Sequence, residues 1–299
     1  MTSENNSNDL MFSIIITTCS REYEILKQAI DSVLSQTYKN YEIIVINDSP
    51  NYFNRKKIDN LVLSYGDKIT YKVNSRQMGA NSSRNLGVDL SLGSIIAFLD
   101  DDDYWDPNRL YLFKIEFEND ADVVYSDMYI FNSFSKRYIK RNESLSNTVD
   151  KLLQNNFLGG FSNVAFRKKN FFDCGRLDNE LLSYQDLDLW IRLCNDAKVR
   201  YVNKPLTYYR VSNNSISLNE EKKLQGLNSI LNKYNSLYKS KPECYEKRLN
   251  LEMCNYLKCG WFKSASKLYK MTDKKLNSTK YYFLGVLKYF ATRLKRNGV

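Results

Sequence analysis

Apolar and polar residues follow one another along the first hundred positions in blocks that suit strands and helices in turn. Apolar runs typical of buried strands occur at 12–16, 41–46 and 94–99, and a further strand is predicted at 68–73. Apolar residues recur at three- and four-residue intervals between these runs, which predicts helices over 22–35, 55–64 and 80–90. Strands and helices in alternation indicate right-handed βαβ units. We therefore predict an α/β fold with a mostly parallel sheet, whose ligands bind at the carboxyl ends of the strands.

The pattern changes after Ile216, where the alternation stops and the remaining chain is predicted to be helical. Apolar stripes lie at Leu224–Leu231, Leu249–Leu257 and Phe262–Leu268. This region carries 18 Lys and Arg against 6 Asp and Glu, whereas the rest of the chain carries 26 against 28, so the net charge of +10 belongs to the C-terminal part. We predict a polar, disordered tail over 1–11, an α/β domain over 12–215 and a basic helical region over 216–299.

The last predicted helix, over 281–296, combines aromatic and aliphatic residues with a basic end. Such a segment is typical of a helix that lies at a membrane surface, but it is also typical of one that packs on the α/β domain or on a second subunit, which leaves a homodimer open. The chain has no run of 18 apolar residues, so no bilayer-spanning segment is predicted.

A basic, tyrosine-rich tail is also compatible with a nucleic-acid-binding protein, which is an alternative function class. No recognition motif supports that reading, and we predict no nucleic-acid partner.

The composition limits the catalytic mechanisms and metal sites that the protein can have, because the 299 residues include no histidine. Ser-His-Asp and Cys-His nucleophile systems and imidazole-bound zinc are thereby excluded. A general base, if the protein has one, is then expected to be a carboxylate. Six cysteines without CxxC spacing and an N-terminus without an apolar signal region predict a reducing, cytoplasmic location, which includes the inner face of the plasma membrane.

Four consecutive aspartates, Asp100–Asp103, end the apolar run at 94–99. So much like charge in one place repels itself, and carboxylates at the end of a strand suit a divalent ion such as Mg²⁺ or Mn²⁺ that shares its ligands with substrate phosphates. The alternative is an ordinary acidic loop after a strand. Next to it, Asp106 before Pro107 predicts a helix N-cap rather than a chemical role.

Three other polar segments follow predicted strands, at 17–20, 47–50 and 74–79. Asp48 could accept hydrogen bonds from a base or ribose, and Arg76 or Arg84 could neutralise a phosphate. The plainer alternatives are a turn residue before Ser-Pro for Asp48 and a helix-surface residue for Arg84.

Taken together, several segments resemble glycosyltransferase family 2 over about Phe12 to Arg210: the Thr-Thr that ends the first strand, SVLSQTY at 32–38, YEIIVIND at 41–48, GANSSRN at 79–85 and GSIIAFLDDDD at 93–103. The resemblance implies a GT-A fold with a helical appendage, a nucleotide-diphosphate sugar donor with uridine favoured, Mn²⁺ or Mg²⁺, and inversion at the anomeric carbon. It also implies a glycan or lipid-linked acceptor of the kind used in surface-polysaccharide assembly.

The resemblance assigns roles to single residues. Thr17 and Asp48 would lie at the nucleoside and Arg84 near the diphosphate, while Asp100 and Asp102 would form the metal- and ribose-binding pair. Because four aspartates follow one another, the family's pair can be aligned with them in more than one way, and Asp101 is also a candidate. Basic Arg210, in the segment that resembles the family's last strand, would reach the diphosphate.

The segment SYQDLDLWIR at 183–192 resembles the family's acidic pair, with Asp186 as the general base that takes the acceptor proton. Gln185 replaces the more common glutamate and would act by hydrogen bonding. The alternative is a capping box from Ser183 to Asp186 at a helix start. Gly160 would belong to the loop around the sugar and acceptor.

Two further points remain open at this stage. Trp105 could stack on a sugar ring, whereas the spacing around Trp190 favours a place in the core. A noncatalytic scaffold with the same fold is the alternative to an enzyme, and the presence of Asp102 and Asp186 speaks against it.

Overall fold

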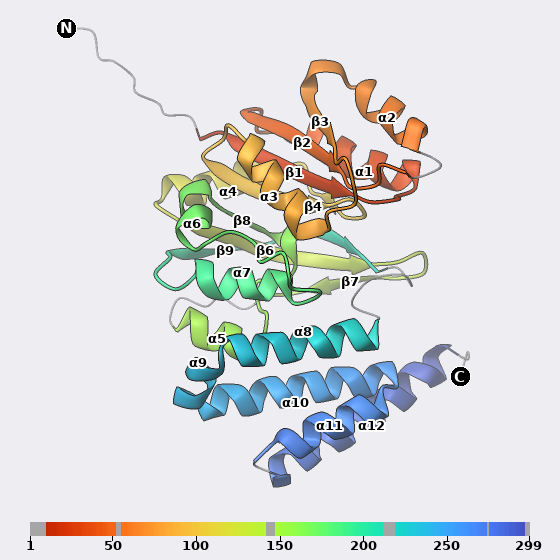
Figure 1. The fold of residues 1–299 in the computed structure, drawn as a ribbon, viewed down its shortest axis with the longest axis vertical. Helices are drawn as coiled ribbons and strands as arrows, with labels where there is room; N and C mark the ends of the chain where they lie inside the picture. The colour runs from red at the N-terminus through yellow and green to blue at the C-terminus, as the bar shows by residue number, and fades with distance from the viewer. Residues whose placement is uncertain (1–9, 52–54, 142–146, 212–218, 274, 297–299) are drawn as a thin grey trace, which may run out of the picture. The chain divides into compact units, whose positions relative to one another are not determined.

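The computed structural model describes residues 10–51, 55–141, 147–211, 219–273 and 275–296 (Figure 1). The chain divides into two compact units, which we call the sheet unit and the helical unit. The sheet unit comprises residues up to 146, 158–179 and 192–211, and the helical unit comprises 147–157, 180–191 and the chain from 212 onward. Most of the predicted N-terminal tail, residues 1–9, lies outside the described residues, whereas Leu10 packs against the core and its carbonyl accepts a hydrogen bond from Tyr38.

One sheet, in the order β3-β2-β1-β4-β8-β6-β9-β5 with β7 beside β6, runs through the described part of the sheet unit. The first four strands in this order are parallel, as the alternation of strands and helices predicts, and β8 then runs antiparallel to β4 and β6. The strands are β1 (Phe12–Thr18), β2 (Tyr41–Asn47), β3 (Ile69–Val73), β4 (Ile95–Asp100), β5 (Tyr104–Trp105), β6 (Val123–Phe131), β7 (Lys136–Ile139), β8 (Val164–Arg167) and β9 (Val199–Arg210).

Helices cover both faces of this sheet because its central strands are apolar on both sides. Phe12, Ile14 and Ile16 of β1 face a core built with residues of α1, α2 and α4. Ile15 points the other way, where a Cβ added to Gly87 of α3 would stand 2.4 Å from the Ile15 side chain, so only glycine permits this close approach. The elements are α1 (Tyr23–Leu34), α2 (Arg55–Leu63), η1 (Gly66–Lys68), α3 (Ala80–Leu90), α4 (Arg109–Glu118), η2 (Phe161–Asn163) and α6 (Lys168–Asp173).

The predicted N-cap at Asp106 is wrong in its position. Helix α4 begins at Arg109 and its N-cap residue is Asn108. Asp106 instead closes a turn just before the helix, where its Oδ1 accepts a hydrogen bond from the Asn108 N–H at 2.9 Å. Asp106 therefore has a structural rather than a chemical role, as a turn residue three positions ahead of the helix.

The helical unit holds the C-terminal helices, which the apolar stripes after Ile216 predict, and also α5 and most of α7, which precede Ile216. Buried Asp188 of α7 joins this helix to α8 by an ion pair with Lys233 at 2.8 Å and a hydrogen bond from Tyr234 at 2.8 Å. Arg248 of α10 donates to the carbonyls of Leu152 and Leu153 at the end of α5. The helices are α5 (Thr148–Gln154), α7 (Gln185–Leu193), α8 (Glu220–Lys233), α9 (Asn235–Ser240), α10 (Pro242–Cys259), α11 (Phe262–Met271) and α12 (Lys275–Arg296).

None of the helices in the described ranges has the length and hydropathy that a membrane crossing requires. All six cysteines are free, in agreement with their unpatterned spacing. Trp190 is fully buried, which confirms its predicted place in the core.

Candidate functional site

The carboxyl ends of four parallel strands bring several predicted site residues to one edge of the sheet. Thr17, near the end of β1, lies opposite Ile46 of β2 on one side and Asp100 of β4 on the other. Asp48 follows β2 directly and donates its backbone N–H to Thr18 O at 2.8 Å. The structure thus places Thr17, Asp48 and Asp100 at a common edge, where parallel sheets bind their ligands.

The Asp48 carboxylate organises the loop between β3 and α3. Its Oδ1 accepts hydrogen bonds from Asn74 Nδ2 at 2.6 Å and from Met78 N at 2.7 Å, and its Oδ2 accepts from Gly79 N at 2.8 Å. The side chain is buried at the start of α3, where Gly79 has a φ of +88° that favours glycine. Asp48 is therefore more than a turn residue, because it holds the loop that borders the edge.

Replacing Asp48 with alanine is expected to destabilise the protein by about 3 kcal/mol, because three donors, two of them in the backbone, lose a charged acceptor. Urea denaturation measures this loss. Asp67→Ala is the matched control, since Asp67 is exposed in η1 and should change stability by less than about 0.5 kcal/mol. Equal stability of Asp48→Ala and the wild type would show that the loop does not depend on this carboxylate.

Arg84 of α3 is buried, with 7% of its surface exposed, and it reaches the same edge. Its Nη2 pairs with Asp100 Oδ1 at 2.6 Å, and its guanidinium carbon lies 4.0 Å from the centre of the Phe161 ring. Its Nη1 is buried and has no hydrogen-bond partner among the residues that the structure describes. An unpaired guanidinium nitrogen next to an acidic strand end is suited to an anionic ligand oxygen.

Arg21 supplies a cation that the sequence analysis did not identify. Its Nη2 lies 2.7 Å from Asp101 Oδ1 and 3.2 Å from Asp102 Oδ2. Burial raises the pKa of Asp101, and Arg21 opposes that rise. Burial also raises the pKa of Asp102 to about 6, with Arg21 acting against the rise and the neighbouring Asp100 and Asp101 charges adding to it.

Asp103 points into the protein, where its Oδ1 accepts the backbone N–H of Arg210 at 2.8 Å. The carboxylate is buried, and this burial raises the pKa of Asp103 well above its usual value. Arg210 also donates from Nε to the Asp102 carbonyl at 2.9 Å. Arg210 thus holds the backbone of the aspartate run from the end of β9.

Ser162 of η2 supports the run from the other side. Its Oγ accepts the Asp100 N–H at 3.0 Å, and its hydroxyl bonds the Asp103 carboxylate. Gly160, predicted to lie at the sugar loop, opens this short helix with φ −72°, and a Cβ there would meet only Tyr209, at 4.0 Å. The three residues after Gly160, which form η2, are buried, and Ser162 among them contacts the start of the aspartate run.

The acidic run has a surplus of negative charge that a divalent ion would relieve. In the described part of the chain, ion pairs tie three of its four carboxylates, those of Asp100, Asp101 and Asp102, to only two guanidiniums, those of Arg84 and Arg21. No three His, Cys, Asp or Glu side chains of the described residues converge as a ligand set. One or two carboxylates together with substrate phosphates suffice for Mg²⁺, so Asp100 and Asp102, both partly exposed, fit such an ion.

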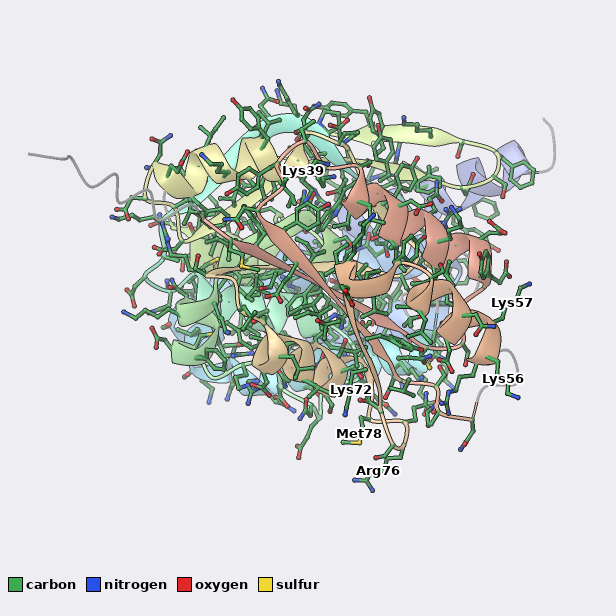
Figure 2. All side chains as sticks on the ribbon, turned by 90° about the horizontal axis from the view of Figure 1, so that it is seen from above. Lys39, Lys56, Lys57, Lys72, Arg76 and Met78 are labelled. Carbon is green, nitrogen blue, oxygen red and sulfur yellow. The ribbon has the colours of Figure 1, made fainter. Side chains whose placement is uncertain are left out.

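Other predicted residues lie apart from this cluster. Arg76 is exposed in the loop after β3, where Figure 2 shows it pointing outward beside Met78, and its Nε lies 3.4 Å from the Met78 sulfur. Trp105 is 2% exposed and donates from Nε1 to Ser162 O at 2.8 Å, so it belongs to the core, which decides the point that the sequence left open against stacking on a sugar ring.

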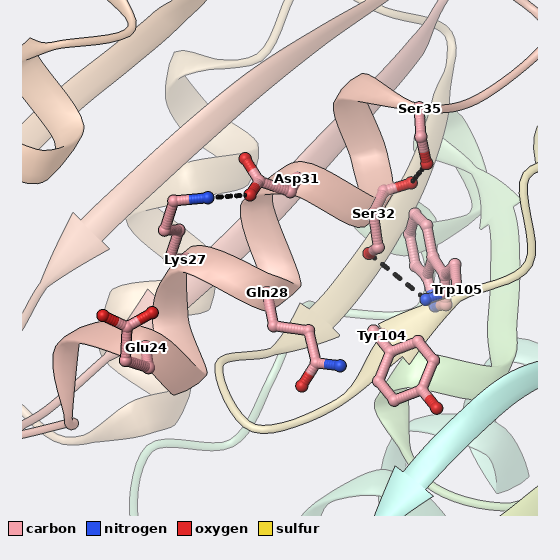
Figure 3. Close-up of a pocket in the computed structure, with 8 residues that line it drawn as sticks. All are labelled: Glu24, Lys27, Gln28, Asp31, Ser32, Ser35, Tyr104 and Trp105. Atoms are coloured by element: carbon pink, nitrogen blue, oxygen red, sulfur yellow. Dashed lines mark hydrogen bonds and ion pairs between the residues drawn. The ribbon is translucent and has the colours of Figure 1, made fainter.

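A shallow pocket of about 540 Å³ lies between α1 and β5 (Figure 3). The Lys27–Asp31 pair and the Ser32 hydroxyl, which accepts the Trp105 backbone N–H at 3.2 Å, form part of its lining. Gln28 of this pocket accepts a hydrogen bond from Arg210. The pocket therefore borders the residue that holds the aspartate run.

Asp186 and Gln185 belong to the helical unit, in the first turn of α7. Asp186 accepts from Leu187 N at 2.8 Å and from Asn156 Nδ2 at 2.8 Å, and it is half-buried. Gln185 donates to Leu181 O at 2.7 Å. The capping-box alternative is wrong for Ser183, whose hydroxyl donates to the Lys222 carbonyl instead.

Two residues of the site, Arg21 and Ser162, were missed from the sequence, and the inward-facing role of Asp103 within the acidic run was not predicted. Arg21 stands one position beyond the polar segment at 17–20, so the same strand-end reasoning would have found it. Ser162 and Asp103 contribute through buried contacts that depend on how η2 and β9 meet β4. No pattern in the linear sequence indicates those contacts.

Comparisons with known proteins agree with this arrangement. A family model described as "Glycosyl transferase family 2" matches residues 13–176. The chain is 29% identical to an uncharacterized glycosyltransferase of Methanocaldococcus jannaschii, over 71% of this chain and 75% of that protein. It is 31% identical to the Escherichia coli UDP-Glc:alpha-D-GlcNAc-diphosphoundecaprenol beta-1,3-glucosyltransferase WfgD, over 73% of this chain and 84% of that protein.

A solved structure of S. aureus TarS residues 1–349 in complex with UDP-GlcNAc has the same fold. The TM-score is 0.58 at 17% identity, and the match covers 97% of this chain and 92% of that one. At this identity the likeness concerns the fold alone, which is the predicted GT-A arrangement of a mostly parallel sheet flanked by helices.

Proposed function

The chain belongs to glycosyltransferase family 2, and from this premise we propose that it transfers a sugar from a uridine-diphosphate donor to a hydroxyl of a lipid-linked glycan, with inversion. The observation that carries the proposal is the strand edge at which Asp48, Arg84 and the Asp100–Asp103 run meet. A nucleotide sugar has a polar nucleoside at one end and a diphosphate in the middle. The edge offers groups of matching chemistry for both.

The descriptions of two similar proteins favour uridine as the nucleoside of the donor. WfgD is named as a UDP-glucose enzyme, and TarS was solved with UDP-GlcNAc and with UDP. In this chain, Thr17 and Asp48 flank the place where a nucleoside would lie, and the unpaired Nη1 of Arg84 would donate to the diphosphate. The name of WfgD also includes a diphosphoundecaprenol acceptor, which supports a lipid-linked glycan as the acceptor here.

Asp100 and Asp102 would hold Mn²⁺ or Mg²⁺, which acts as a Lewis acid toward the leaving diphosphate when bound. Arg21 and Arg210 hold the aspartate run in place through the Asp101 and Asp103 carboxylates and the Asp102 carbonyl. These contacts would keep the aspartate run oriented, and the metal would share the Asp100 and Asp102 carboxylates with Arg84 and Arg21.

Asp186 would act as the general base. The acceptor hydroxyl would lose its proton to this carboxylate while its oxygen forms a bond to C1 of the sugar and the bond from C1 to the diphosphate oxygen breaks. A single in-line displacement of this kind inverts the anomeric carbon. Asn156 and the Leu187 N–H would orient the carboxylate for this step.

UDP together with Mn²⁺ is expected to raise the melting temperature by about 5 °C at a concentration 100-fold above the Kd, because a ligand that binds only the folded state stabilises it. Differential scanning fluorimetry measures this shift. GDP and dTDP with Mn²⁺, and UDP with EDTA, are the controls and should produce smaller shifts. A larger shift with GDP or dTDP than with UDP would refute the uridine assignment.

A further inference from the structure

Helix α12 packs one of its faces on α10 and α11 and leaves the other exposed. On the packed face, a Cβ at Gly285 would stand 2.7 Å from Leu257 of α10, and the ring of Tyr289 lies 5.1 Å from that of Phe262 of α11. On the other face, Phe283, Leu287 and Phe290 are 63%, 64% and 57% exposed. Their spacing of i, i+4 and i+7 aligns them in one stripe.

The exposed stripe continues onto neighbouring positions and is accompanied by basic residues. Leu284 and Tyr281 are 38% and 43% exposed, and Lys280 and Lys288 are exposed as well. The sequence from 274 to 299 contains seven Lys and Arg and no Asp or Glu. Lys280 shares a pocket of about 500 Å³ with Glu243 and Glu246 of α10, so its charge is partly offset.

We propose that this α12 face, defined by Phe283, Leu287 and Phe290 with Lys280 and Lys288, docks on the surface of an anionic lipid bilayer. Aromatic and leucine side chains next to lysines are the composition of helices that lie in a membrane interface, where the rings enter the acyl boundary and the ammonium groups remain at the headgroups. The helix is too polar to cross the bilayer, and it lies flat on the surface.

A second copy of this chain fits the α12 face less well. A two-fold dimer brings the α12 face against itself, so the lysines of both copies would gather at one interface, where α12 supplies no carboxylate and Glu243 and Glu246 of α10 offset only part of the charge of Lys280. An anionic bilayer offers both the apolar depth and the opposite charge. The inference goes beyond the proposed transfer reaction, because it involves none of the residues assigned to the donor or to the base.

Vesicle flotation of the full chain tests the proposal. We expect binding to vesicles with 30% phosphatidylglycerol to exceed binding to pure phosphatidylcholine by more than tenfold, and to weaken as salt is raised. The triple variant Phe283→Ser, Leu287→Ser, Phe290→Ser should lose at least about 90% of this binding. Leu63→Ser, Leu92→Ser, Phe134→Ser is its matched control, since these residues are also exposed but lie in the sheet unit, and it should bind like the wild type.

A variant that lacks the two lysine charges separates the electrostatic contribution to vesicle binding from the contribution of the apolar stripe. Lys280→Gln with Lys288→Gln should lower the vesicle partition coefficient roughly tenfold, at about 1 kcal/mol for each lysine near the surface and less for the partly offset Lys280. Lys39→Gln with Lys56→Gln is the control, because both lysines are exposed and belong to the sheet unit. Failure of the wild type to float with anionic vesicles would overturn the proposal.

Two other outcomes would also overturn it. One is equal flotation of the triple variant and its control. The other is a mass by light scattering that corresponds to a dimer for the wild type and a monomer for the triple variant, since a second copy would then cover the α12 face. Thermal shifts with UDP do not depend on this face, so a failure here is distinguishable from a failure of the proposed reaction.

Discussion

Replacing Asp102 with asparagine is expected to abolish most sugar transfer and, at the same time, to make the ligand-free protein more stable at pH 7.5. The loss of activity should be about 100-fold or more, because one of the two carboxylates assigned to the metal and the diphosphate becomes neutral. The gain in stability follows from electrostatics. Burial and the charges of Asp100 and Asp101 hold the pKa of Asp102 at about 6, so the ionised carboxylate is unfavourable in the folded state.

The sign and the pH range of this effect follow from that raised pKa. The folded protein binds the Asp102 proton more tightly than the unfolded chain, so the associated stability is fully present below about pH 4 and is lost as the pH rises through 6. At pH 7.5 the asparagine variant should be more stable by about 2 kcal/mol, and the difference should shrink toward pH 5. Urea denaturation of both proteins in EDTA at the two pH values measures it.

Asp67→Asn is the control for Asp102→Asn, since it removes the same charge from an exposed position and should change neither stability nor activity. A variant at Asp102 that is less stable than the wild type at pH 7.5 would show that the ion pair with Arg21 outweighs the burial and the repulsion. Unchanged transfer activity would remove Asp102 from the donor site.

Replacing Asp186 with asparagine is expected to lower kcat for transfer roughly 100- to 10,000-fold while the affinity for UDP stays the same. Asparagine keeps an oxygen that can accept the Leu187 N–H, so the first turn of α7 should be preserved, but it cannot take a proton from the acceptor. Kinetics with a lipid-linked acceptor, together with UDP titrations, measure both quantities.

The neighbouring Asp188 serves as the control, because its replacement should lower the stability of the fold rather than the rate of the chemical step. Asp188 is fully buried and paired with Lys233 and Tyr234, so Asp188→Asn should lower stability by about 2–4 kcal/mol and affect kcat far less than Asp186→Asn at a temperature where it is folded. Full transfer activity of Asp186→Asn would reject Asp186 as the base and leave the family membership untouched.

The parallel part of the sheet could be predicted from the sequence because its strands are buried on both faces. The run at 41–46 therefore differs from the observed β2 by a single residue. The antiparallel part was harder to predict, since its strands mix apolar and polar residues. In β6, buried Asp127 accepts hydrogen bonds from Arg141 N, from Tyr201 at 2.7 Å and from Tyr138, so a charged residue lies inside a strand only because distant groups satisfy it.

The residues of the site that directly follow a strand could be predicted from the sequence, because the strand determines where they lie. The sequence indicated that Asp100–Asp103 needs positive charge, and part of that charge comes from Arg21 and Arg84 of the same chain. Arg84 was expected near a phosphate, and its pairing with Asp100 could not be foreseen from the sequence. The partner of a side chain depends on which strands lie next to each other, as Thr17 and Asp100 do, and local motifs carry no information about that. For the same reason the local cap motif at Ser183 failed, because its hydroxyl bonds to α8.

The most direct test of the account is the anomalous scattering of manganese in crystals grown with UDP and Mn²⁺. The account predicts a manganese peak bonded to carboxylate oxygens of the Asp100–Asp103 run and to the diphosphate, with Arg84 on the diphosphate and the uridine beside Asp48. A manganese ion and a diphosphate seated away from this edge, with the four aspartates in their ligand-free contacts, would contradict it.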